Sequence, residues 1–288
     1  MLRAEFLPRR ASLCAALLAS LLLAACGSAP KVSEPVLRKQ AQEAEADGAR
    51  RYARGDYAGA ARNYAVASQL QQSLDDPAAA ARNQLHQARA ELAAAQAEAA
   101  LNRAKSITHA EFALDALLLQ AQANLALGKP AAAQENLAAA AASCAANCPQ
   151  SASLNLLQAR AALVDQRAAD ALRHAEAALK LLQGKDEAAE TGNAWRLIAT
   201  ARLASGDAAG ALPAAQAALD IDRQLALPEK IARDWLLIGD IRKKLGAGGT
   251  AAAYQRALDV ASAAGLQEIA GIAAQAINEV KPPQGNTR

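Results

Sequence analysis

The chain has 288 residues and a formal net charge of +3, and hydrophobic residues make up 53% of it although aromatic residues supply only 3%. Alanine accounts for the difference, and such a composition favours helix over sheet and excludes a core built from bulky side chains. Small side chains instead allow helices to pack closely, as they do in repeat solenoids. Most of the net charge lies in residues 1–25, so the rest of the chain gives no reason to expect nucleic-acid binding.

Residues 1–26 have the three parts of a secretory signal. Three arginines within the first ten residues supply the positive start, and an almost wholly apolar segment runs from Ala11 to Leu23. This segment is shorter than the ~20 residues that a membrane-spanning helix needs. Leu-Ala-Ala-Cys follows and ends at Cys26.

This ending resembles the lipobox of bacterial lipoproteins. The resemblance implies removal of residues 1–25, attachment of a diacylglycerol to the Cys26 thiol and acylation of its new amino group. Several acyl chains on one residue hold a protein stably to a bilayer. An aspartate after this cysteine often signals retention in the inner membrane, whereas Gly27 and Ser28 stand here. The resemblance therefore implies the outer membrane, facing the periplasm. The alternatives are an ordinary signal peptide with an incidental cysteine and an uncleaved anchor.

Residues 26–35 are polar and contain proline, so we expect a lipidated N-terminus followed by a flexible tether. Further on, Cys144 and Cys148 lie between an alanine-rich segment and Pro149. In an oxidising periplasm a local disulfide is the favoured interpretation of this pair. A metal-binding pair and a redox site are the alternatives. The pair lacks a second set of metal ligands, and its spacing is not the CxxC of thioredoxin-like enzymes.

Residues 36–264 divide into about six units in which two amphipathic helices flank a turn. The clearest unit is Asn193–Asp222, which has a Gly-Asp turn at 206–207 followed by alanines and an Ala-Leu pair. One face of its first helix consists of Trp195, Ile198, Ala199 and Arg202. Turns are expected near residues 55, 92, 128, 166, 206 and 246.

This pattern resembles the tetratricopeptide (TPR) repeat, whose common period is ~34 residues. The resemblance implies an all-α, TPR-like α-solenoid of about six helical hairpins. A capping helix over 265–280 and a disordered tail at 281–288 complete the expected chain. One stretch stays open: residues 78–105 contain no glycine or proline, so they form either two helices with a turn near Leu92–Ala94 or a single long helix.

Catalytic and metal-binding motifs are absent from the sequence. The three histidines, His86, His109 and His174, lie far apart, and we found no nucleophile elbow, zinc-protease motif or phosphate-binding loop. We therefore expect no enzyme, no cofactor and no metal site. Trp195 and Trp235 occupy the leading aromatic position of their units, and we expect them to pack between helices rather than to bind a ligand.

In TPR-like arrays the first helices of successive pairs line a concave groove. The residues that the resemblance places there are Tyr52, His86, Gln122, Leu125, Arg160, Leu163, Arg196, Thr200, Asp240 and Lys243. This mixture of apolar and polar side chains suits a peptide or helix ligand. No consistent Lys/Asn/Arg clamp for a C-terminal carboxylate falls at these positions.

The sequence thus favours a lipid-anchored periplasmic scaffold that binds a protein or peptide partner. Envelope assembly, secretion, pilus biogenesis and peptidoglycan-synthase control are the processes in which such lipoproteins act. A carrier of a small molecule or lipid in the solenoid cavity is the alternative. A lytic transglycosylase is less favoured, because we expect no room for its catalytic domain after residue 264.

Overall fold

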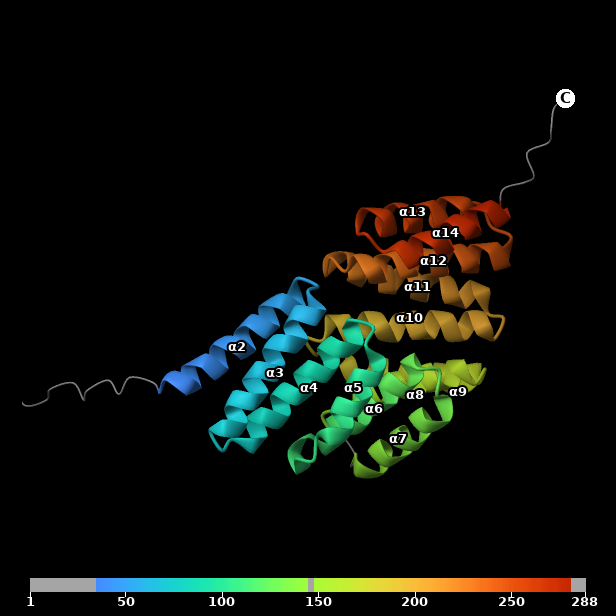
Figure 1. Ribbon diagram of the computed structural model, residues 1–288. Helices are drawn as coiled ribbons and strands as arrows, with labels where there is room; N and C mark the ends of the chain where they lie inside the picture. Colours follow the sequence, from blue (N-terminus) through green and yellow to red (C-terminus); the bar gives the residue numbers. More distant parts are fainter. Residues whose placement is uncertain (1–34, 145–147, 281–288) are drawn as a thin grey trace, which may run out of the picture.

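The computed structural model describes residues 35–144 and 148–280, and these residues form thirteen α-helices, one 3₁₀ turn and no β-strand (Figure 1). The α-helices are α2 (Val36–Ala53), α3 (Tyr57–Ser73), α4 (Pro77–Ala93), α5 (Ala97–Ser106), α6 (Ala113–Ala126), α7 (Pro130–Ser143), α8 (Ser151–Val164), α9 (Ala168–Leu182), α10 (Ala188–Ala204), α11 (Ala208–Gln224), α12 (Pro228–Leu245), α13 (Thr250–Ala263) and α14 (Gln267–Val280). The prediction of an all-α fold is confirmed. The predicted signal, Cys26 and the C-terminal tail lie outside the described residues.

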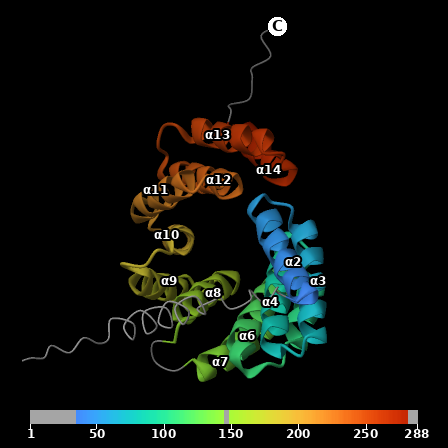
Figure 2. The ribbon, with the colours of Figure 1, turned by 90° about the vertical axis from the view of Figure 1, so that its left-hand side faces the viewer.

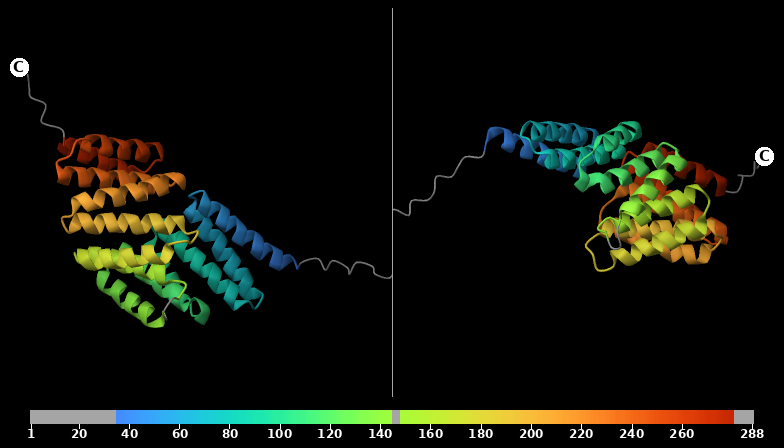
Figure 3. Two further views of the ribbon diagram at one scale, coloured as in Figure 1. Left: turned by 180° about the vertical axis from the view of Figure 1, so that it is seen from behind. Right: turned by 90° about the horizontal axis from the view of Figure 1, so that it is seen from below.

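The helices form six hairpins, α2–α3, α4–α5, α6–α7, α8–α9, α10–α11 and α12–α13, and α14 closes the array. The end-on view in Figure 2 shows these units following a strongly curved path, with the second helices on its outer side. Figures 2 and 3 show that the turn between α2 and α3 comes back toward α12. We call the side formed by the first helices, α2, α4, α6, α8, α10 and α12, the inner face.

Every hairpin turn uses the same backbone conformation. A left-handed residue ends each first helix, and in four units it is glycine, as at Gly55 and Gly206. In the second and fourth units it is Ala95 and Gln166, both with φ of 59°. The next amide then donates to a carbonyl five residues earlier, as Gln96 does at 2.8 Å, which satisfies the end of the helix. The single-helix alternative for 78–105 is therefore wrong, and the left-handed residue of the turn, Ala95, lies three residues after the predicted position 92.

Replacing Ala95 with glycine is expected to stabilise the chain by about 1 kcal/mol, because a side chain in the left-handed region is strained and glycine is not. Thermal unfolding followed by circular dichroism would show a melting temperature a few degrees higher. The matched control is Ala93→Gly in the last turn of α4, which should lower it. A lower melting temperature for Ala95→Gly would contradict the assigned turn.

In two hairpins a glycine of the first helix packs against a tyrosine of the second. Gly48 of α2 packs against the ring of Tyr64 in α3, and Gly239 of α12 packs against Tyr254 in α13. A Cβ atom at Gly239 would lie 2.3 Å from Cε1 of Tyr254, whose hydroxyl donates to Asp240 at 2.7 Å. Hairpins of this kind depend on the missing side chain.

The two tryptophans pack against the largest hydrophobic cluster, whose residues come from every helix between α8 and α13. Both are half-buried, so the prediction that they pack between helices is confirmed. The ring of Trp235 is also flanked by two guanidinium groups, with Arg223 at 5.1 Å and Arg256 at 4.9 Å from its centroid. These contacts tie α11, α12 and α13 together.

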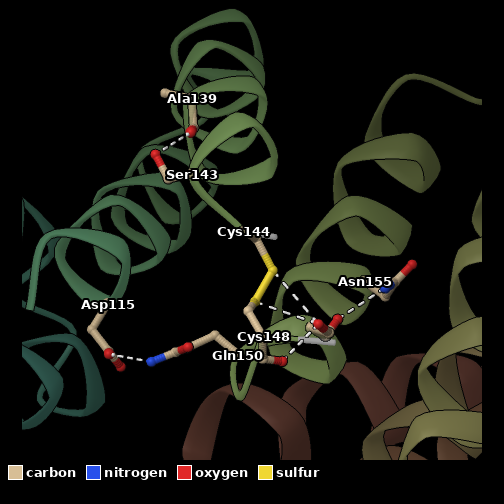
Figure 4. Close-up of a disulfide and its surroundings, with 8 residues drawn as sticks. Asp115, Ala139, Ser143, Cys144, Cys148, Gln150 and Asn155 are labelled. Carbon is tan, nitrogen blue, oxygen red and sulfur yellow. Dashed lines mark hydrogen bonds between the residues drawn. A yellow bond between two sulfur atoms is a disulfide. The ribbon is translucent and has the colours of Figure 1, made fainter. Parts of the chain in front are cut away.

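The structure contains a disulfide between Cys144, which caps α7, and Cys148, with Cα atoms 5.5 Å apart (Figure 4). Ser151 at the start of α8 donates its hydroxyl to the Cys148 carbonyl at 2.7 Å. Figure 4 also shows Gln150 next to Asp115, and its amide donates to that carboxylate at 2.9 Å. The disulfide therefore lies at the junction between the third and fourth units.

Replacing Cys144 and Cys148 together by serine is expected to lower the free energy of unfolding by about 2 kcal/mol, because the closed loop is short. Peptide mass spectrometry on unreduced protein should find the two residues linked. Wild-type protein with reductant should melt at the same temperature as the double variant. Free thiols at both positions in unreduced protein would contradict the pairing.

Candidate functional site

A ladder of ion pairs runs along the inner face and joins the first helices of neighbouring units. The links are Arg82 of α4 to Glu45 of α2 (3.4 Å), Arg89 of α4 to Asp115 of α6 (3.0 Å), Arg196 of α10 to Asp234 of α12 (2.6 Å), and Lys243 of α12 to Glu279 of α14 (3.0 Å). These contacts help to hold the units in register.

The strongest part of this ladder is a buried cluster of one arginine and two aspartates. Arg196 also donates to Asp222 of α11, and both aspartate side chains have no exposed surface while the arginine keeps 18%. Burial raises the pKa of Asp234 to about 6. The positive charge of Arg196 lowers this pKa, and the negative charge of Asp222 raises it. The Oδ1 atom of Asp222 has no hydrogen-bond partner among the described residues. The cluster thus joins α10, α11 and α12.

The structure gives Arg196 a different role from the one predicted. Its guanidinium is committed to the two buried aspartates, so it is not free to bind a partner. Thr200 donates its hydroxyl to the Arg196 carbonyl at 2.9 Å. Asp240 accepts from Tyr254, and Lys243 pairs with the carboxylate of Glu279. These four predicted groove residues make contacts within the chain.

Four other predicted groove residues are half-buried. Leu125 of α6 and Leu163 of α8 pack against hydrophobic clusters, and Gln122 lies in α6 three residues before Leu125. His86 stacks on Tyr64 with ring centroids 5.2 Å apart, and burial lowers its pKa. These residues contribute more to packing than to an exposed surface.

Tyr52 and Arg160 are the two predicted groove residues that are exposed and whose side chains make neither a hydrogen bond nor an ion pair among the described residues. Burial by surrounding protein raises the pKa of Tyr52, and the charges of Arg89 and Glu190 also act on it. The charge of Glu190 acts on Arg160 as well. Charges on α4 and α10 therefore influence Tyr52 of α2, and a charge on α10 influences Arg160 of α8.

Sequence reasoning missed Arg89, Glu190 and Arg233, which act on Tyr52 or Arg160. Such effects between helices distant in sequence depend on the curvature of the array, which brings the turn between α2 and α3 back toward α12. A repeat pattern gives the face of each helix but not this curvature.

The two best-formed depressions in the described residues are small. One, of about 200 Å³, is lined by charged residues and Trp235. The other, of about 300 Å³, lies between Leu179, Lys185 and Ile221. Sites that enclose a drug-sized ligand measure about 300–1,000 Å³. The first depression is smaller than this range and the second lies at its lower limit, so both leave little room for a lipid or small molecule.

Residues 35–144 and 148–280 contain no group of three or more histidine, cysteine, aspartate or glutamate side chains placed to hold a metal ion. Within the same ranges, none of the helices is both long and apolar enough to cross a bilayer.

Comparison with solved structures places the fold. The chain aligns with the hetero-tetramer Cut9–Hcn1 of APC/C at a TM-score of 0.68 and 15% identity, over 84% of this chain and 43% of that one. It aligns with apo RapI at a TM-score of 0.60 and 13% identity, over 85% of this chain and 71% of the RapI chain. A STAND-class signal transduction ATPase with a tetratricopeptide repeat sensor, from Pyrococcus horikoshii, aligns at a TM-score of 0.60 and 16% identity. This alignment covers 77% of this chain and 36% of the ATPase chain.

The fold is a TPR-like α-solenoid. The resemblance seen in the sequence is confirmed at the level of the fold, which is what identities this low can show. The chain spans less than half of the matched Cut9–Hcn1 chain. No protein-family model matches the sequence, and no curated protein resembles it closely enough to count as a relative.

Proposed function

We propose that this chain is a scaffold that binds a protein or peptide partner on its inner face while acyl chains on Cys26 hold it to the outer membrane. The observation that carries the proposal is the inner face itself, on which Tyr52 of α2 and Arg160 of α8 are exposed and make no side-chain hydrogen bond or ion pair among the described residues. A surface assembled from several units suits an elongated ligand such as a peptide. The small size of the depressions argues against a carrier.

Site-specific photo-crosslinking in living cells tests the binding face. A photoreactive amino acid at Tyr52, which is 40% exposed on the inner side, is expected to capture a partner protein. The matched control is Val66 of the outer helix α3, which is 50% exposed. Mass spectrometry of the adduct would identify the partner and hence the process, whether envelope assembly, secretion, pilus biogenesis or peptidoglycan-synthase control. Equal capture from both positions would contradict the proposal.

Membrane fractionation tests the anchor. Cys26→Ser is expected to abolish incorporation of labelled palmitate and to prevent cleavage of the signal. Density-gradient separation should find the wild-type protein with the outer membrane. Gly27→Asp should move it to the inner membrane, since the sorting signal would change. Wild-type protein without attached lipid would overturn the lipoprotein part of the proposal and leave the binding face untouched.

A further inference from the structure

The depression of about 200 Å³ lies between α11 and α12 and is lined by two arginines. Leu219, Trp235 and Ile238 supply its apolar lining, and Gln216, Asp220, Arg223 and Arg242 supply its polar lining. The guanidinium carbon of Arg223 lies 5.1 Å from the centroid of the Trp235 ring, and that of Arg256 from α13 lies 4.9 Å from it. Guanidinium groups from three helices therefore gather around one depression.

The fifth unit provides an internal comparison for this place. It has the same apolar residues one repeat earlier in the sequence, at Leu179, Trp195 and Ile198. Arg202 of α10 corresponds to Arg242 of α12. Arg202 donates to the Gly210 carbonyl at 3.1 Å, and Arg242 donates to the Gly249 carbonyl at 3.3 Å. The two arginines thus occupy equivalent positions.

The equivalent arginines differ in their counter-ions. Arg202 faces the carboxylate of Glu176, from the preceding helix α9, at 3.5 Å. The corresponding residue of the preceding helix α11 is Gln216, whose amide carries no charge. No ion pair among the described residues involves Arg242. The sixth unit therefore lacks the carboxylate that the fifth unit supplies from within the chain.

The sixth unit also has two arginines that the fifth unit lacks. Gln183 stands where the sixth unit has Arg223. Ala217 precedes the buried Ala218 as Arg256 precedes the buried Ala257, so this position has changed as well. The differences between the two units all make the surroundings of Trp235 more positive, except for Asp220.

The charge and size of the depression fit a phosphate group. Asp220 is the one carboxylate of its lining, and it faces Arg223 at 3.5 Å in an exposed pair of the kind that is weak. Three guanidinium groups against one carboxylate leave an excess of two positive charges. Guanidinium groups bind phosphate oxygens through paired hydrogen bonds, and a phosphate group carries up to two negative charges. The volume suits such a group rather than a drug-sized ligand.

We propose that the depression between α11 and α12 binds a phosphate group, which takes at Arg242 the place that Glu176 takes at Arg202. Arg223 is the second donor, and Arg256 adds positive charge from α13. The phosphate belongs either to a soluble ester or to a lipid headgroup. The proposal does not depend on the scaffold function, since none of the predicted groove residues lines this depression.

Titration of the purified chain with sodium phosphate at constant ionic strength tests the proposal. In the variant Trp195→Phe, tryptophan emission comes from Trp235 alone and is expected to change saturably. In the matched variant Trp235→Phe, emission comes from Trp195, beside which Glu176 already faces Arg202, and no change is expected. Sodium acetate should bind at Trp235 at least tenfold more weakly, because a carboxylate offers fewer acceptor atoms and a single charge.

Further changes in the Trp195→Phe chain locate the contact. Gln216→Glu supplies the carboxylate that the fifth unit has, so it should weaken phosphate binding at least tenfold, and Arg242→Met should do the same. The matched control is Gln72→Glu on α3, which adds the same charge far from the depression and should leave the dissociation constant unchanged. Equal melting temperatures would show that the variants are folded.

Two phosphate esters distinguish the possible sources. Tighter binding of glycerol 3-phosphate would assign the site to a soluble ester, whereas tighter binding of dihexanoyl phosphatidylglycerol, a lipid with short acyl chains, would assign it to a headgroup. The proposal is overturned if none of the phosphate compounds changes the Trp235 emission saturably, or if acetate binds as well as phosphate. Equal losses from Gln216→Glu and Gln72→Glu would overturn it too.

Discussion

Arg196→Met is expected to lower the free energy of unfolding by about 3–5 kcal/mol at pH 7.5, because it removes the cation from two fully buried carboxylates. Methionine retains most of the arginine stem, so the loss measures the unpaired charge of Asp222 and Asp234 rather than a cavity. Chemical denaturation of the variant, followed by circular dichroism, would show the shift in the unfolding midpoint.

The matched control is Arg202→Met on the same helix α10. Arg202 faces Glu176 at 3.5 Å in a more exposed pair, so its loss should cost less than about 1 kcal/mol. The triple variant in which Arg196→Met is combined with Asp222→Asn and Asp234→Asn should regain much of the lost stability. Equal stabilities for the two arginine variants would refute the importance of the buried cluster.

The same cluster predicts how stability depends on pH. The pKa of Asp234 is raised to about 6 in the folded chain, whereas an unfolded aspartate titrates near 3.9. The folded state therefore binds the proton more tightly, and this contribution is complete below pH ~4 and is lost as the pH rises through 6. We expect a higher melting temperature at pH 5 than at pH 7.5. The variant Asp234→Asn should reduce that difference, and an unchanged difference would count against the raised pKa.

Gly239→Ala is expected to destabilise the chain by about 2–3 kcal/mol, since the new Cβ would lie 2.3 Å from Cε1 of Tyr254. The ring cannot easily move away, because it is 1% exposed and its hydroxyl is held by Asp240. This cost outweighs the gain of about 1 kcal/mol that alanine normally brings to a helix. The melting temperature should fall by several degrees.

Gly271→Ala in α14 provides the matched control, because no atom lies within 4 Å of the added Cβ there. It should raise the melting temperature, since only helix propensity changes. Adding Tyr254→Val to Gly239→Ala should cost less than the two single changes summed, because the clash disappears with the ring. Similar effects at positions 239 and 271 would contradict the close packing of α12 on α13.

The fold was predictable because its main signals are local. Helix periodicity and the Gly-Asp turns identified the hairpins, and the capping helix followed from the pattern after residue 264. The turn at Ala95 was harder to predict, because its left-handed conformation is set by the helix-terminating hydrogen bonds and not by a glycine. The turn at Gln166 also lacks a glycine, but the repeat period placed it correctly.

The candidate site was less predictable because it depends on contacts distant in sequence. Position in the repeat placed Arg160 and Arg196 on the same kind of helix face, with nothing to distinguish them. Their roles differ because two aspartates from α11 and α12 enclose Arg196, whereas α8 has no acidic neighbour within reach. The effect of Glu190 on the pKa of Tyr52 depends on the arrangement of the whole array, because the two residues lie in helices distant in sequence.

Both tryptophans of the chain lie in the fifth and sixth units, at positions 195 and 235. Intrinsic tryptophan emission therefore reports on the C-terminal part of the array alone, while helix ellipticity sums over all units. Because each unit contacts mainly its neighbours, the two signals need not change at the same temperature. The molecule thus carries its own internal probe of whether the array melts cooperatively or unravels from one end.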